Sequence, residues 1–139
     1  MSVAAGRDQA GVIGAEGRGG EPTTVVVVDD HDGFRTMAAV LLAADGFRVV
    51  GEAATGQQAV AVVAALAPEV VLLDVQLPDI DGFAVLRSLR RAGVPAKVVL
   101  CSVRAAGDYG SRLEGCGATG FLTKSALTAG ALRSLLRVG

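Results

Sequence analysis

The fold of this 139-residue chain is decided by the stretch Val70-Val71-Leu72-Leu73-Asp74-Val75-Gln76-Leu77-Pro78-Asp79-Ile80-Asp81-Gly82. Four consecutive branched apolar residues predict a strand buried on both faces, because a strand with one solvated face alternates apolar and polar residues. The run ends in Asp74 and a loop that contains proline and glycine. In open α/β sheets ligands bind outside the carboxyl ends of the strands, so Asp74 is a candidate functional residue.

The composition predicts one folded domain without a membrane span. Hydrophobic residues make up 51% of the chain, which is enough for a substantial core at this length. The net charge of −1 provides no basic surface and argues against direct nucleic-acid binding by this chain. The longest apolar helical stretch, residues 59–67, is far shorter than the roughly 20 residues of a membrane span, and the N-terminus lacks the apolar centre of a signal peptide. We therefore expect a cytoplasmic protein.

Residues 1–22 are expected to form a flexible tail, and residues 23–139 the folded domain. The tail contains many glycines and scattered charges but little apolar periodicity, so burial cannot offset the entropy of ordering it. Cys101 and Cys116 lack the spacing of a metal site and are expected to be small free hydrophobic residues.

Strand-like and helix-like segments alternate along residues 23–139. Strands are expected to start near residues 24, 47, 70, 96 and 118, a spacing of 22 to 26 residues. Such alternation gives a parallel sheet with helices on both faces. Arg48, Gly51 and Glu52 interrupt the second strand, residues 47–53, which therefore suits an edge of the sheet. The expected fold class is α/β, a doubly wound five-stranded parallel sheet in the order 2-1-3-4-5.

Helices are expected between the strands and after the last one. Their inward faces are predicted from apolar residues at helical spacing: Phe34, Met37, Ala38 and Leu41; Ala59, Val62, Val63 and Leu66; Phe83, Leu86 and Leu89; Ala131, Leu132, Leu135 and Leu136. Thr55 with Gln58 forms a capping box, and Thr128 can cap the last helix. A fourth helix is expected over residues 105–114. It should be the weakest, because Gly107 and Gly110 each cost about 0.8–1.0 kcal/mol relative to alanine.

The predicted strand order brings charged residues together at one edge of the sheet. Strands one and three are neighbours, so Asp29 and Asp30 come beside Asp74, and three gathered carboxylates need a cation. Oxygen ligands suit Mg²⁺, which binds through one or two carboxylates and shares a substrate phosphate. Ser102 and Lys124, which follow strands four and five, add a hydroxyl donor and a cation. With Asp74 as the nucleophile, this set of groups suits phosphoryl transfer.

These motifs resemble those of response-regulator receiver domains in two-component signalling, particularly the receivers of helix-turn-helix response regulators. They are Val-Val-Asp29-Asp30-His31, Leu-Leu-Asp74 followed by Leu-Pro-Asp-Ile-Asp-Gly, Ser102, and Gly-Ala-Thr-Gly-Phe121-Leu-Thr-Lys124. The resemblance covers residues 23–139 and implies the flavodoxin-like receiver fold.

The resemblance implies an acceptor and a set of metal ligands. Asp74 matches the phospho-acceptor of the family. Asp30 and Asp74 match direct ligands of Mg²⁺, together with the backbone carbonyl of Gln76, and Asp29 matches an acidic partner that acts through water. The implied cofactor is therefore Mg²⁺.

The resemblance also implies a switch. Ser102 matches the switch hydroxyl, Lys124 the lysine that pairs with the phosphate, and Phe121 the switch aromatic residue. Ser125 follows Lys124 where many receivers have proline, so the cis peptide bond usual at that place is not expected. No output domain is expected after the last helix, which ends near Gly139.

The expected function is that of a signalling module. A histidine kinase or phosphotransfer protein would phosphorylate Asp74, and residues 105–114, the fifth strand and the last helix would bind a downstream protein. The chain would catalyse only its own phosphorylation and dephosphorylation, without turnover of a free substrate. The oligomeric state is left open, with a homodimer as one option.

Two alternatives stay open at this point. The chain could be a detached receiver of a DNA-binding transcriptional regulator, which a helix-turn-helix sequence downstream in the gene would establish. It could also be a Mg²⁺-dependent phosphohydrolase with an aspartyl-phosphate intermediate, although such enzymes place a second aspartate where this chain has Gln76. A nucleotide-binding Rossmann domain is excluded, because no Gly-x-Gly-x-x-Gly follows residues 25–28. His31 is expected to be exposed and Tyr109 to pack on the fourth helix.

Overall fold

The computed structural model describes residues 21–138, and the predicted tail lies outside them except for Glu21 and Pro22. Five parallel strands form one sheet in the order β2-β1-β3-β4-β5, which confirms the predicted fold class and topology. The strands are β1 (Thr23–Val28), β2 (Phe47–Ala53), β3 (Val70–Asp74), β4 (Lys97–Ser102) and β5 (Gly120–Thr123). Because all of them run parallel, their carboxyl ends meet at one edge.

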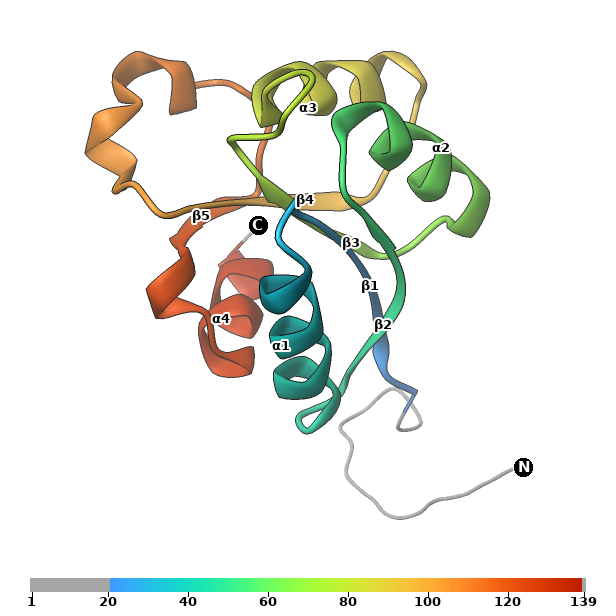
Figure 1. Cartoon of the computed structure of the whole chain (residues 1–139). Helices are drawn as coiled ribbons and strands as arrows, with labels where there is room; N and C mark the ends of the chain where they lie inside the picture. The colour runs from blue at the N-terminus through green and yellow to red at the C-terminus, as the bar shows by residue number, and fades with distance from the viewer. Residues whose placement is uncertain (1–20, 139) are drawn as a thin grey trace.

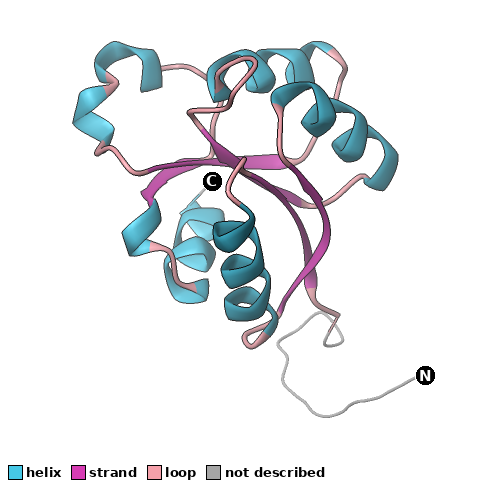
Figure 2. Ribbon diagram, in the orientation of Figure 1, coloured by secondary structure: helices cyan, strands magenta, loops and turns pink. Residues whose placement is uncertain are grey.

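Helices cover both faces of the sheet (Figures 1 and 2). On one face lie α1 (Asp32–Ala43) and α4 (Ala129–Val138), and on the other α2 (Gly56–Leu66) and α3 (Gly82–Arg91). Successive residues of β3 serve the two cores in turn: Leu73 packs with residues of α2 and α3, and Leu72 with residues of α1 and α4. This explains why β3 reads as a continuous apolar run.

The predicted capping residues Thr55 and Thr128 make capping hydrogen bonds, but the capping box at Thr55 is incomplete, because Gln58 Oε1 accepts from the Ala54 N–H and not from the Thr55 N–H. Thr55 Oγ1 accepts from the Gln58 N–H at 3.1 Å, and Thr128 Oγ1 accepts from the Ala131 N–H at 2.9 Å. At the start of α3, the Asp81 carboxylate caps the helix. Each of these bonds satisfies a backbone donor that has no partner within its helix.

The predicted helix over residues 105–114 is wrong. The segment contains two short 3₁₀ turns, η1 (Ala106–Asp108) and η2 (Gly110–Leu113), on the same face of the sheet as α2 and α3 (Figure 1). Gly110 has φ +55°, in the left-handed region, whereas an α-helix needs φ near −63°. Gly110 was expected only to weaken a helix, but its left-handed backbone conformation is incompatible with a continuous α-helix over residues 105–114.

Two predicted helix faces differ from the observed ones at single positions. Met37 was expected to point inward, but it is 41% exposed, whereas Leu42 is fully buried. Ala38 and Leu42 are one turn apart and lie on one side of the helix. The buried face of α1 is therefore rotated slightly from the predicted face, which included Met37. Leu66, at the end of α2, is 45% exposed.

Strand β2 occupies the predicted edge position and has an irregular register. Its pairing with β1 shifts between Val25 and Val26, and Arg48 and Glu52 are exposed. A Cβ atom on Gly51 would lie 2.5 Å from Leu66 Cδ1. Glycine at this position therefore lets α2 pack closely on the edge strand.

Other expectations are met within residues 21–138. Cys101 and Cys116 are free, and burial raises the pKa of the Cys101 thiol to about 12, so Cys101 behaves as a small core residue. None of the peptide bonds in this part of the chain is cis. Every helix described is too short or too polar to cross a membrane.

Candidate functional site

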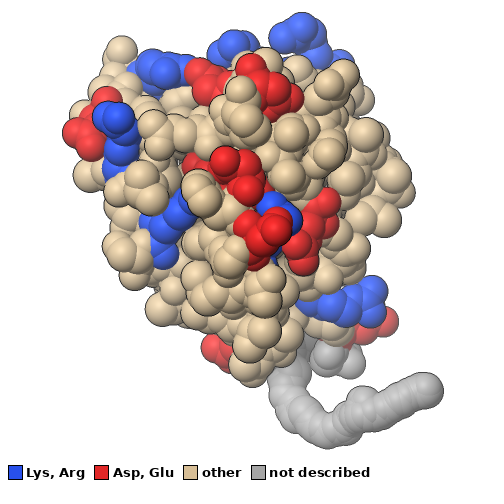
Figure 3. Space-filling model, viewed as in Figure 1, with Lys and Arg blue, Asp and Glu red and all other residues tan. Residues whose placement is uncertain are grey.

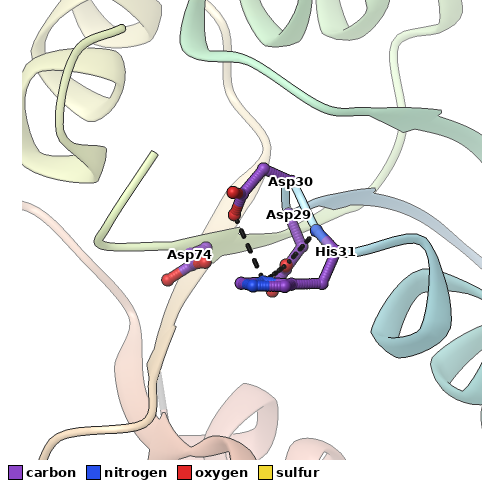
Figure 4. A group of neighbouring side chains, drawn as sticks. All are labelled: Asp29, Asp30, His31 and Asp74. Atoms are coloured by element: carbon purple, nitrogen blue, oxygen red, sulfur yellow. Dashed lines mark hydrogen bonds and ion pairs between the residues drawn. The ribbon is translucent and has the colours of Figure 1, made fainter. Parts of the chain in front are cut away.

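Strands β1 and β3 bring four potential ligand residues to one place (Figure 4). Val28 pairs with Leu73, so the residues that follow the two strands lie side by side. One carboxylate oxygen from each of Asp29, Asp30 and Asp74 and one ring nitrogen of His31 all lie within 4.8 Å of one another. The carboxylates that the strand order predicted to be neighbours are therefore neighbours in the structure.

The two aspartates that follow β1 differ in their surroundings. The side chain of Asp29 is 1% exposed, whereas that of Asp30 is 35% exposed. The His31 N–H donates to Asp29 Oδ1 at 2.9 Å, and His31 Nδ1 lies 3.2 Å from Asp29 Oδ1 and 3.3 Å from Asp30 Oδ1. The side chain of His31 is largely exposed, as predicted, but its ring lies against the acidic residues (Figure 4).

Lys124, directly after β5, provides the cation nearest to the buried carboxylates. Its Nζ atom lies 2.6 Å from Asp29 Oδ2 and 3.2 Å from Asp74 Oδ2. Burial alone would lower the pKa of Lys124, but the close ionic contact with Asp29 and the charges of Asp74 and Asp29 outweigh burial and raise it. The amine is therefore held in its charged form between two carboxylates.

Asp74 is held through both of its carboxylate oxygens. Oδ1 accepts from the Gln76 N–H at 3.0 Å, and Oδ2 faces Lys124. Burial raises the pKa of Asp74, and the charge of Asp29 adds to this effect, while Gln76 and Lys124 oppose it. The residue is 4% exposed, yet it borders an open pocket.

The pocket has a volume of about 280 Å³ and opens to solvent. It is lined by Asp30, His31, Asp74, Gln76, Leu77, Pro78, Val103 and Lys124. Acidic side chains gather in the middle of the visible face, where β1 leads into α1 (Figures 1 and 3). A small anionic group could reach Asp74 here only if cations offset the negative charge of the carboxylates.

The donor set at this site fits Mg²⁺. Three carboxylates supply hard oxygen ligands, and Lys124 alone cannot balance their charge. Asp29 Oδ2 is buried, and its contact with Lys124 is an ion pair without an aligned hydrogen bond within the described part of the chain. An oxygen in this situation can accept a further positive partner.

The predicted switch residues lie on the α2/α3 side of the sheet. Ser102 ends β4 and is fully buried, and half-buried Phe121 pairs with Leu100 across β4 and β5. The Ser102 Oγ atom lies 2.6 Å from the hydroxyl of Tyr109 and accepts from the Arg104 N–H at 3.0 Å. The contact between Ser102 and Tyr109 was not predicted, because no sequence periodicity relates a strand end to a residue in an irregular segment.

The loop that follows Asp74 is tied down at two points that sequence reasoning also missed. Asp79 accepts from the N–H groups of Gly56 and Gln57 at the start of α2, at 2.8 and 2.9 Å. These two hydrogen bonds lower the pKa of Asp79. Asp81 pairs with Arg112 of η2 at 2.6 Å. The loop carrying Gln76 is thus attached both to α2 and to the 3₁₀ segment.

A doubly wound sheet with buried aspartates and a lysine at its carboxyl edge belongs to the class of α/β proteins that bind ligands at a topological switch point. Residues 25–137 match the family model described as the response regulator receiver domain. The chain belongs to this family, and it is a receiver domain of two-component signalling.

Individual relatives agree with this family. The chain is 42% identical over 103 residues to the response regulator GacA of Pseudomonas viridiflava, a match that covers 73% of this chain and 48% of GacA. It is 31% identical over 100 residues to the transcription regulator BvgA of Bordetella pertussis, with 72% and 48% covered. The chain spans about half the length of these curated relatives.

Solved structures show the same fold. The signal receiver domain of NarL from Mycobacterium tuberculosis aligns with a TM-score of 0.76 and 33% identity, covering 85% of this chain and 96% of that one. The chemotaxis response regulator CheY4 of Vibrio cholerae aligns with a TM-score of 0.72 and 25% identity, covering 85% and 99%.

Proposed function

We propose that Asp74 accepts a phosphoryl group from a histidine kinase or phosphotransfer protein, and that its phosphorylation changes a protein-binding face. The proposal is carried by one observation: Asp74 both borders the open pocket and pairs with Lys124. Asp30 borders the pocket, but the basic side chain nearest to its carboxylate is the His31 ring, with Nδ1 at 3.3 Å. Asp29 pairs with Lys124, but it is fully buried and is not among the residues that line the pocket.

In the proposed reaction, a carboxylate oxygen of Asp74 attacks the phosphorus atom of a phosphohistidine. The P–N bond breaks, and its electron pair returns to the histidine nitrogen of the donor. Lys124 stabilises negative charge on the transferring group, and the Gln76 N–H holds the carboxylate in place. Bound Mg²⁺ would neutralise charge on the phosphoryl oxygens, with Asp30, Asp74 and the Gln76 carbonyl as its proposed direct ligands and Asp29 acting through water.

In the proposed function, the chain transmits a signal and turns over no free substrate. Its only reactions would be its own phosphorylation and dephosphorylation, in the cytoplasm, where kinases have access to ATP. The face proposed to bind a downstream protein comprises η1, η2, β5 and α4. A phosphohydrolase is less well supported, because the amide of Gln76 cannot act as the acid that such enzymes place at this position.

A second candidate function is that of the receiver half of a DNA-binding regulator. It is favoured by the match to BvgA, which is named as a transcription regulator and is about twice as long as the aligned region. In that case, the regulated step would be DNA binding by a separate output domain. A helix-turn-helix sequence downstream in the source gene would support this candidate.

Intact-mass measurement tests the proposed function. Incubation with acetyl phosphate and Mg²⁺ should add one phosphoryl group to the wild-type protein, and omission of the metal or the Asp74→Asn change should abolish the addition. Asp45→Asn is the control, because Asp45 pairs with Arg133 away from the pocket and its variant should be labelled to the wild-type extent. Labelling of Asp74→Asn to that extent would refute the assignment of the acceptor.

Metal affinity is expected to depend more on Asp30 than on Asp29. Asp30 borders the pocket, whereas Asp29 already has Lys124 as its partner. Asp30→Asn should therefore weaken Mg²⁺ binding by about tenfold or more, while it slightly stabilises the metal-free fold by removing one like charge. Titration calorimetry with Mg²⁺ measures this. Equal losses of Mg²⁺ affinity in Asp29→Asn and Asp30→Asn would contradict the prediction that Asp30 contributes more to metal binding.

A further inference from the structure

The Ser102 hydroxyl already has partners outside the lining of the Asp74 pocket. Its oxygen accepts from the Arg104 N–H at 3.0 Å and shares a hydrogen bond of 2.6 Å with the Tyr109 hydroxyl. A serine hydroxyl has one proton and two lone pairs. If Ser102 gives its proton to Tyr109, that proton is not available to a group bound at Asp74.

The position of Ser102 supports this conclusion. Ser102 is fully buried and is not among the residues that line the pocket, although its neighbour Val103 lines it. Along β4, Leu100 packs in the core on the α2/α3 side, and Ser102, two residues on, points to that same side. To donate to a phosphoryl oxygen in the pocket, the hydroxyl must turn and leave Tyr109.

Tyr109 is held in place by aromatic neighbours. Its ring centroid lies 5.9 Å from those of Phe83 and Phe121, with interplanar angles of 61° and 57°. Arg112, in the next turn, lies 4.3 Å over the Phe83 ring and pairs with Asp81. Two side chains therefore anchor residues 104–114: Tyr109 through its hydroxyl on Ser102, and Arg112 through its ion pair with Asp81.

We propose that Tyr109 is a positioning residue that holds Ser102 in the resting state, so that phosphorylation of Asp74 and release of Tyr109 are mutually dependent. The inference rests on the proposed function of Asp74 and adds a residue to it. When Ser102 turns toward a phosphoryl oxygen, the Tyr109 hydroxyl loses its partner and gains one only by moving toward water. Because Tyr109 joins η1 to η2, this movement changes the surface of residues 104–114.

Tyr109→Phe tests the proposal, because it removes the hydroxyl and keeps the ring against Phe83 and Phe121. A hydrogen bond of ordinary strength corresponds to a shift of about 2- to 10-fold in an equilibrium. The initial rate of phosphorylation by acetyl phosphate with Mg²⁺ should rise by about that factor, because Ser102 no longer has to break its hydrogen bond to the Tyr109 hydroxyl. An unchanged or lower rate would overturn the proposal.

A double-mutant cycle separates positioning from a purely structural role. In a Ser102→Ala background there is no hydroxyl to release, so Tyr109→Phe should leave the rate of phosphorylation unchanged. If the effect of Tyr109→Phe persists in that background, Tyr109 does not act through Ser102. Arg112→Met is the matched control, because it removes the other anchor: amide exchange in residues 104–114 should become faster without a rise in the phosphorylation rate.

The spectrum of Tyr109 provides a measurement that does not depend on phosphorylation. The chain contains one tyrosine and no tryptophan, so its intrinsic fluorescence reports on Tyr109 alone. Ser102→Ala should change this fluorescence in the unphosphorylated protein, and beryllofluoride with Mg²⁺ should change it in the wild type but not in Asp74→Asn. No change in Ser102→Ala would refute the resting contact. Absence of phosphorylation in the wild type would instead refute the proposed function.

Discussion

Replacement of Lys124 by methionine is expected to lower the free energy of unfolding by about 3–5 kcal/mol at neutral pH in the absence of Mg²⁺. The Lys124 side chain is 13% exposed, and its two partners, Asp29 and Asp74, are 1% and 4% exposed. Methionine keeps most of the length of the side chain but leaves two buried carboxylates without their cation. A buried carboxylate without a cationic partner lowers the free energy of unfolding far more than the loss of a surface ion pair does.

The loss in Lys124→Met should depend on pH. Burial already raises the pKa of Asp74 in the wild type, and removal of the ammonium raises it further. The folded variant then binds a proton that the unfolded chain, with an ordinary pKa of roughly 4, has released. Stability of the variant should therefore fall as the pH rises from roughly 4 through the raised folded-state value. In the wild type, the folded state raises the pKa of Lys124 above its ordinary value of 10.5. The contribution of Lys124 to the free energy of unfolding is therefore lost only at high pH, as the pH rises from 10.5 through this raised pKa.

Urea denaturation in EDTA across this pH range measures both effects. The other lysine of the chain, Lys97, is the control: it is exposed and donates to the Leu136 carbonyl, so Lys97→Met should cost less than about 1 kcal/mol. Added Mg²⁺ should stabilise Lys124→Met more than the wild type, because the ion can replace the missing charge. Equal stabilities of wild type and Lys124→Met at neutral pH would contradict the structural role of this lysine.

Gly82→Ala is expected to affect both stability and phosphorylation. A Cβ atom at this position would lie 2.5 Å from the Asp74 carbonyl oxygen and 2.9 Å from Val75 Cα. Both contacts are with backbone atoms, and the Gly82 N–H also donates to the Val75 carbonyl at 2.7 Å. The start of α3 and the end of β3 must therefore separate. Overpacking of this kind costs about 1–3 kcal/mol, and a displacement of about 1 Å at Asp74 can lower the phosphorylation rate about 100-fold.

Gly33→Ala is the matched control for this change. Gly33 also lies in the first turn of a helix, α1, but a Cβ atom there would have no neighbour within 4 Å. Alanine at this position should leave stability unchanged or raise it by up to about 1 kcal/mol. Thermal unfolding and intact-mass kinetics on the two variants make the comparison. If Gly82→Ala behaves like Gly33→Ala, the close approach between α3 and β3 is not required.

The sheet and the gathering of carboxylates could be predicted because both follow from strand order. The apolar run that ends in Asp74 identifies a central strand, and the interrupted strand with Arg48 and Glu52 identifies an edge. Once the order is known, Asp29 and Asp30 must follow the strand next to Asp74. No side-chain geometry is needed for this step.

Other features depend on conformations that a sequence pattern does not specify. The left-handed backbone at Gly110 turns an expected helix into two 3₁₀ turns, although glycine is also compatible with a weak helix. Lys124 Nζ lies closer to Asp29 Oδ2, at 2.6 Å, than to Asp74 Oδ2, at 3.2 Å, and no sequence pattern specifies this difference. The hydrogen bond between Ser102 and Tyr109 arises only because the irregular segment folds back over the strand end.

The two outer strands of the sheet bear on how copies of this chain can associate. An unpaired strand edge can template pairing with another chain, and proteins protect such edges with charges, irregular register or short strands. At β2 the edge carries exposed Arg48 and Glu52 and the register shift near Gly51, and β5 is only four residues long. Neither edge offers a long flat template, so continuous sheets across two molecules are disfavoured. Dimers of this receiver should therefore form through helical or 3₁₀ surfaces, and aggregation through β-pairing should require prior unfolding.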